Sequence, residues 1–149
     1  MKKLIVLLLV LSIFTACKKD CHYQSDYFIF GRYSSFCIDD CSKLFLMKDG
    51  KIYPDSIQGL STNLQFSKVP LTSSKYTIAF PLITSFPSFL QNTPNVTCGC
   101  PDCLDQGSYY IEKMENGVKK TWRIDTFIDS IPVQIQPYIH QMDSIINKI

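Results

Sequence analysis

The chain of 149 residues carries 15 Lys and Arg against 13 Asp and Glu, and 46% of its residues are hydrophobic. Lys2 and Lys3 belong to an N-terminal segment that we expect to be removed, and without them 13 basic residues balance 13 acidic ones. This balance argues against a nucleic-acid-binding protein and against a polybasic patch for anionic lipids, and the size fits one folded domain.

The N-terminus has the three parts of a bacterial secretory signal. A short cationic start is followed by an apolar run over residues 4–14, and small Thr15 and Ala16 then precede Cys17. A helix that spans a bilayer needs roughly 20 apolar residues, so this run is too short for a permanent span. Small residues directly before a cysteine are typical of a lipobox, although an ordinary secretory signal with a chance cysteine is the alternative.

We therefore predict a lipoprotein signal peptide over residues 1–16 and acyl chains, palmitate among them, on Cys17. Residues 17–25 are polar and would form a tether, and residues 26–149 would form a single domain. Lys18 follows the acylated cysteine and argues against an inner-membrane retention signal, which favours the outer membrane of the cell envelope.

The first half of the domain predicts strands and then a helix. Residues 27–33 are aromatic and β-prone, and residues 44–47 and 52–53 flank Asp49-Gly50, a dipeptide that favours a tight hairpin turn. A helical spacing begins near Thr72 and continues to Phe86. Pro81 must kink or restart this helix, and Pro87 is expected to end it.

The second half predicts another hairpin and a closing helix. Residues 109–112 and 120–125 are β-prone and are joined through Asn116-Gly117, again a tight-turn signal. Beyond Pro132 and Pro137, apolar residues from Ile139 to Ile149 recur at helical spacing. The order of elements predicts an α+β domain in which two helices pack on one face of a mainly antiparallel sheet.

The cysteines carry the most distinctive chemistry. Besides Cys17 and the isolated Cys21, the chain has Cys37 and Cys41 as C-x3-C and a C-G-C-P-D-C segment that contains Cys98, Cys100 and Cys103. Six thiols allow fifteen pairings. In an oxidising envelope we expect structural disulfides, either within the pairs Cys37/Cys41 and Cys100/Cys103 or between them.

Two other interpretations of these cysteines stay open. Cys37, Cys41, Cys100 and Cys103 could supply four thiolates to a zinc ion, with the two short motifs acting as knuckles. A redox-active C-x-x-C at Cys100 would need a helix after it to stabilise the thiolate, whereas the chain continues through Gly107 into a β-prone run.

The remaining polar residues do not form a catalytic motif that the sequence reveals. Neither histidine lies in a nucleophile motif, and carboxylates scattered along a chain are ordinarily solvated. This ordinary interpretation applies to Asp39-Asp40, Asp102, Asp105, Glu112 and Asp125. We therefore expect a non-enzymatic protein.

On its C-x3-C pair, its C-P-D-C-x-D-x-G segment over residues 100–107 and its W-R-I-D-T segment over residues 122–126, the chain resembles uncharacterised small lipoproteins of Bacteroidetes-type bacteria. The resemblance covers most of the mature chain and implies envelope localisation and one α+β domain. It implies no activity, cofactor or catalytic residue. The resulting hypothesis is a disulfide-stabilised lipoprotein that binds or scaffolds an envelope partner, with a zinc-binding lipoprotein second and a thiol–disulfide oxidoreductase third.

Overall fold

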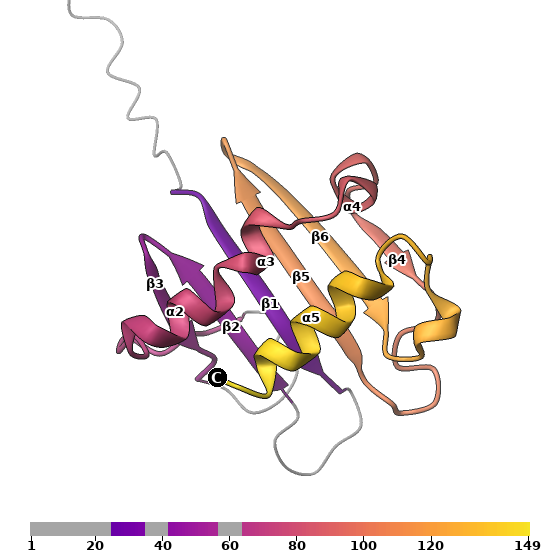
Figure 1. Cartoon of the computed structure of the whole chain (residues 1–149), viewed down its shortest axis with the longest axis horizontal. Helices are drawn as coiled ribbons and strands as arrows, with labels where there is room; N and C mark the ends of the chain where they lie inside the picture. Colours follow the sequence, from indigo (N-terminus) through magenta and orange to yellow (C-terminus); the bar gives the residue numbers. More distant parts are fainter. Residues whose placement is uncertain (1–24, 35–41, 57–63) are drawn as a thin grey trace, which may run out of the picture.

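The structure, a computed structural model, describes residues 25–34, 42–56 and 64–149 and contains one mixed sheet covered by helices (Figure 1). The six strands lie in the order β3-β2-β1-β5-β6-β4. Neighbouring strands are antiparallel except for β4 and β6, which pair in parallel. The strands are β1 (Tyr27–Tyr33), β2 (Ser42–Lys48), β3 (Lys51–Pro54), β4 (Val96–Cys98), β5 (Ser108–Glu115) and β6 (Val118–Asp125). The α+β class and the mainly antiparallel sheet are thus confirmed.

Both predicted hairpins form, and their turns have the backbone conformation that the sequence predicted. Asp49 and Gly50 between β2 and β3 have φ of 50° and 71°, and Asn116 and Gly117 between β5 and β6 have φ of 53° and 76°. Two successive residues with positive φ match the twist of the flanking strands, and Asp-Gly and Asn-Gly adopt this conformation at low cost. The two turns therefore fix the register of both hairpins.

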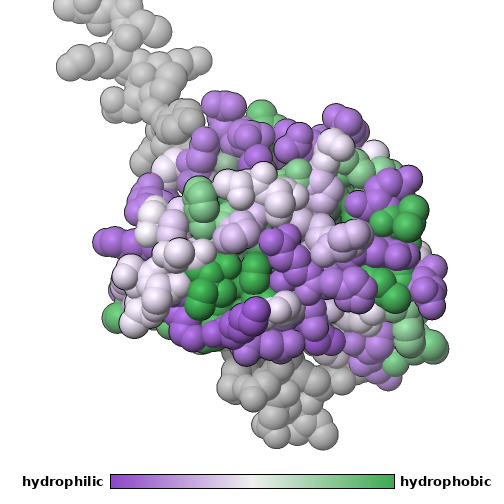
Figure 2. Space-filling view, in the orientation of Figure 1, coloured by the Kyte–Doolittle hydropathy of each residue, from purple (hydrophilic) through white to green (hydrophobic). Residues whose placement is uncertain are grey.

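The helices lie over one face of the sheet. In Figure 1, α2, α3 and α5 cross the strands on the near side, and α4 lies beside β4 at one edge. The helices are α2 (Ser73–Ala79), α3 (Pro81–Thr84), α4 (Ser88–Asn92) and α5 (Gln136–Ile146), with a 3₁₀ turn η2 (Ile128–Ser130). The outer surface of this layer is largely hydrophilic, with small separate hydrophobic patches (Figure 2).

The core lies between the sheet and this helix layer. Alternate residues of β1, Phe28 and Phe30, point into it, because successive side chains of a strand face opposite ways. Trp122 of β6 is almost fully buried there, and its ring nitrogen donates hydrogen bonds to the carbonyls of Leu90 (3.1 Å) and Thr93 (2.8 Å). These bonds tie α4 to the sheet.

Proline positions and one short strand depart from the sequence prediction. Pro81 restarts the helix, since α2 ends at Ala79 and α3 begins at Pro81. Pro87 does not end a helix: α3 ends at Thr84, and Pro87 is the N-cap of α4, which the sequence did not predict. Strand β4 was also missed. The closing helix is confirmed as α5, although it ends before Ile149.

None of the helices in residues 25–34, 42–56 and 64–149 combines the length and the apolar character needed to cross a bilayer.

Candidate functional site

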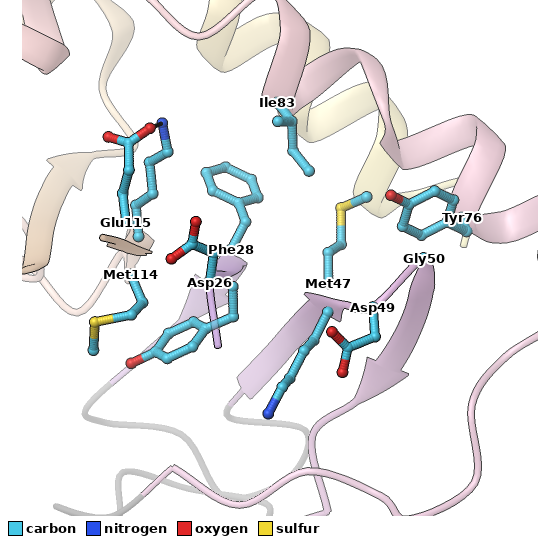
Figure 3. A pocket seen from close by; sticks show the side chains of 12 residues that line it. Asp26, Phe28, Met47, Asp49, Gly50, Tyr76, Ile83, Met114 and Glu115 are labelled. Carbon is cyan, nitrogen blue, oxygen red and sulfur yellow. Dashed lines mark hydrogen bonds and ion pairs between the residues drawn. The ribbon is translucent and has the colours of Figure 1, made fainter. Parts of the chain in front are cut away.

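A pocket of about 290 Å³ opens at the end of the sheet where β1 begins, β2 turns into β3 and β5 ends (Figure 3). The floor is apolar: Phe28 and Met47 rise from the sheet, and Tyr76 of α2 and Ile83 of α3 point toward them from the helix layer. Met114 lies at the β5 side of the pocket. The pocket therefore lies between this end of the sheet and the helices α2 and α3.

Charged residues of both signs form the rim of the pocket. Lys113 and Glu115 neutralise each other through an ion pair of 2.9 Å, and the Asp26 carboxylate accepts a hydrogen bond from the Asn116 backbone N–H at 2.9 Å. The remaining rim charges, Lys48 and Asp49, make no ion pair with any residue that the structure describes. The pocket therefore has a small apolar floor, and Lys48 and Asp49 lie at its solvent-accessible edge, at the β2–β3 turn.

A buried carboxylate lies next to this pocket, on the sheet face opposite the helices. Glu112 is only 6% exposed and accepts hydrogen bonds from the hydroxyls of Tyr27 (2.7 Å) and Tyr110 (2.6 Å). Lys119 adds an ion pair at 3.5 Å. Burial, and then the hydrogen bond to Glu112, raise the pKa of both tyrosines, because ionisation would place an anion beside the carboxylate. Tyr27 also lines the pocket, so this cluster supports one of its walls.

The C-P-D-C segment forms a loop between β4 and β5 that is closed by a disulfide. Cys100 and Cys103 are bonded to each other, so the local pairing is present and their sulfur atoms do not cross-link to the C-x3-C pair. The loop consists of turns and leads into β5, as predicted, and not into a helix that could stabilise a thiolate. Gly107 returns the chain to the sheet with a φ of 78°.

Asp125, at the end of β6, holds this loop in place. Its carboxylate accepts hydrogen bonds from the backbone N–H of Cys100 (2.8 Å) and of Phe127 (2.9 Å) and from the side chain of Gln106 (3.3 Å). Burial by itself raises the pKa of Asp125, but these hydrogen bonds outweigh it and leave the pKa below its usual value. Gly99 is required beside it, since a Cβ there would lie 2.6 Å from that of Asp125.

The other cysteines are only partly described. Cys98 is a free, buried thiol whose pKa is raised by burial. Cys17, Cys37 and Cys41 lie outside the described residues, so acylation of Cys17 stays a prediction. The four-cysteine zinc site also stays a prediction, and it would require reduction of the Cys100–Cys103 disulfide to supply two of its thiolates. Within the described ranges, no three His, Cys, Asp or Glu side chains are grouped as a metal site requires.

Sequence reasoning missed the pocket and the burial of two acids. Glu112 and Asp125 were expected to be solvated, and that expectation is wrong, since they are 6% and 2% exposed. Some of their partners come from distant parts of the chain: Tyr27, which donates its hydroxyl to Glu112, is 85 residues away in the sequence. The alternation along β5 held one signal, because Glu112 shares its face of the strand with Tyr110 and Met114.

Comparison with known proteins gave no match to a family model, to a curated protein or to a solved structure.

Proposed function

We propose that this chain is a membrane-anchored lipoprotein of the bacterial cell envelope with a non-enzymatic binding or scaffolding role. In this proposal, residues 1–16 are removed as a signal peptide, acyl chains on Cys17 hold the chain to the outer membrane, and residues 17–25 form the tether. The family likeness to small lipoproteins of Bacteroidetes-type bacteria belongs to the same proposal.

The observation that carries the proposal is the disulfide between Cys100 and Cys103, considered together with the cysteine that follows the apolar N-terminal run. Disulfides persist in secreted and envelope proteins and are rare where cellular thiols are kept reduced. A lipobox and a structural disulfide each indicate export, and they do so through unrelated chemistry. The disulfide also supports a structural role for Cys100 and Cys103 as a cross-link that closes their loop.

The pocket supports the binding role. It combines an apolar floor with a charged rim, a composition found in small-molecule sites. It also opens where β1 begins, which is the end of the domain nearest the proposed tether.

Intact mass spectrometry and palmitate labelling of the expressed full-length chain test the anchor. We expect a mature chain that begins at Cys17 and carries diacylglycerol or three acyl chains. Cys17→Ala should abolish labelling and leave the precursor uncleaved, whereas the matched control Cys21→Ala should be processed normally. Normal cleavage and release of the Cys17→Ala chain would instead indicate an ordinary secretory signal.

A further inference from the structure

The disulfide between Cys100 and Cys103 is unlike a cross-link that holds a whole domain together. It joins residues only three apart in the sequence, and the stabilisation that a disulfide provides grows with the length of the segment that it closes. Both cysteines are exposed residues of the loop between β4 and β5. Asp102, inside the closed segment, has a φ of 64°, which is unfavourable for residues other than glycine. Exposed and strained disulfides are the ones that are reduced most easily.

The contacts that hold this loop to the sheet do not involve the sulfur atoms. The backbone N–H of Cys100 donates to the Asp125 carboxylate (2.8 Å), and the Cys100 carbonyl accepts a hydrogen bond from the side chain of Gln106 (3.1 Å). The Gln106 side chain in turn accepts a hydrogen bond from the backbone N–H of Leu104 (2.6 Å). Strands β4 and β5 are both paired with β6. Opening of the disulfide would therefore change the loop and leave the sheet in place.

A third cysteine lies two residues before the disulfide and is shielded from solvent. Cys98 of β4 is 6% exposed and packs in the core between the sheet and the helices. Burial also raises the pKa of its thiol, so that less of it is present as the reactive thiolate. A reagent in solution should therefore distinguish Cys100 and Cys103 from Cys98.

The short closed segment also determines which kind of reductant can open the disulfide. A monothiol that attacks one sulfur leaves the other cysteine as a thiol close by, and this thiol displaces the monothiol and restores the disulfide. A dithiol instead resolves the mixed disulfide with its own second sulfur. In the complete exchange the dithiol loses two electrons and two protons and becomes a disulfide, and Cys100 and Cys103 gain them and become thiols.

We propose that the Cys100–Cys103 disulfide is a redox site that envelope proteins with an exposed dithiol reduce while the domain stays folded. The oxidised loop is the resting form in an oxidising envelope, and reduction releases its closed conformation. Because no helix follows the loop to stabilise a thiolate, these cysteines are the substrate of the exchange and not its catalyst. The redox site goes beyond the proposed binding role, and its test does not depend on the acyl anchor.

Alkylation of the purified protein before and after reduction tests the proposal. Trypsin cleavage after Lys75 and Lys113 leaves all three cysteines in one peptide, whose mass counts the alkyl groups. We expect none on the folded oxidised protein, two after treatment of the folded protein with dithiothreitol, and three only when the reductant acts in denaturant. Reduced glutathione at the same thiol concentration should leave the folded protein unlabelled.

Cys98→Ala is the matched control, because it keeps the disulfide and removes the buried thiol. Its peptide should carry two alkyl groups after reduction with or without denaturant. No labelling of the folded native chain after dithiothreitol would show a shielded structural cross-link and would overturn the proposal. Three alkyl groups on the folded native chain would also overturn it, since reduction would then open β4 together with the loop. Equal labelling with glutathione would overturn the assignment to dithiols.

Discussion

Replacing Asp125 with Asn should destabilise the domain by an amount that depends on pH. Asp125 is 2% exposed, and its two carboxylate oxygens accept the backbone N–H of Cys100 and of Phe127. Asn has nearly the same shape but only one acceptor oxygen, and its NH₂ group is a donor. One of the two backbone N–H groups therefore loses its partner in a part-buried position.

The expected cost follows from these contacts. A hydrogen bond to a charged group contributes about 1.5–3 kcal/mol, and a buried donor without a partner costs about 1–3 kcal/mol. We therefore expect Asp125→Asn to lower the free energy of unfolding by about 2–3 kcal/mol at pH 7. For a domain of this size, such a loss lowers the melting temperature by roughly 10 °C.

The pH dependence provides the sharper test. The hydrogen bonds hold the pKa of Asp125 below its usual value in the folded state, so the unfolded chain binds the proton more readily. The carboxylate's contribution is thus fully present above the unfolded pKa of about 3.9 and is lost as the pH falls through the lower folded pKa. The difference between the native chain and Asp125→Asn should be constant from pH 8 to about pH 5 and shrink below about pH 4.

Urea unfolding followed by circular dichroism across this pH range measures the effect. Asp129→Asn is the control, because Asp129 is exposed four residues further on and should change stability little. The reasoning is refuted if Asp125→Asn unfolds at the native urea midpoint at pH 7. It is also refuted if the difference persists unchanged at pH 3.

Two further perturbations test the sheet. Gly31→Ala should prevent stable folding, because its Cβ would lie 2.1 Å from a backbone carbonyl oxygen of β2, whereas Gly117→Ala, with nothing within 4 Å of its Cβ, should cost only about 1 kcal/mol in urea unfolding. Equal stability of the two variants would contradict this packing. At alkaline pH, the raised pKa values of Tyr27 and Tyr110 mean that their contribution is complete below the unfolded value of about 10 and is lost as the pH rises above it. The urea midpoint of the native chain should therefore fall between pH 9 and 11. It should fall less in the Tyr27→Phe, Tyr110→Phe double variant, which keeps Glu112 but has no ionisable hydroxyls beside it. An equal fall in both chains would exclude these tyrosines as the cause.

The fold was predictable where local chemistry decides the backbone. Asp49-Gly50 and Asn116-Gly117 adopt the positive φ that their residue types favour, and the predicted strand over residues 27–33 coincides with β1. The paired strands then follow, because each tight turn brings its two β-prone segments together in one register. The residues that specify a hairpin all lie within a segment of about a dozen residues.

Prediction failed where the outcome depends on neighbours in space. Pro87 was expected to stop a helix, yet a proline is equally compatible with the start of the next one. The hydrogen bond from the Trp122 ring nitrogen to the Leu90 carbonyl, which helps to hold α4, joins residues 32 apart in the sequence. Strand β4 has three residues and pairs in parallel with β6, so no alternation long enough to detect precedes it.

The buried acids and the pocket could not be predicted from the sequence for the same reason. A buried carboxylate cannot be told from a solvated one in sequence until its donors are placed, and Tyr27 on β1 and Cys100 in the disulfide loop are donors remote in sequence from Glu112 and Asp125. Once placed, the two acids have different consequences. Asp125 is enclosed by the disulfide loop and contributes to the stability of the domain. Glu112 instead holds Tyr27 at the edge of the pocket. The other charges at this edge, Lys48 and Asp49, have no ion-pair partner in the described part of the chain. Because burying a charge without partners is costly, the two buried acids need the donors that the fold supplies, whereas Lys48 and Asp49 lie at a hairpin turn where solvent hydrates them and need no partner.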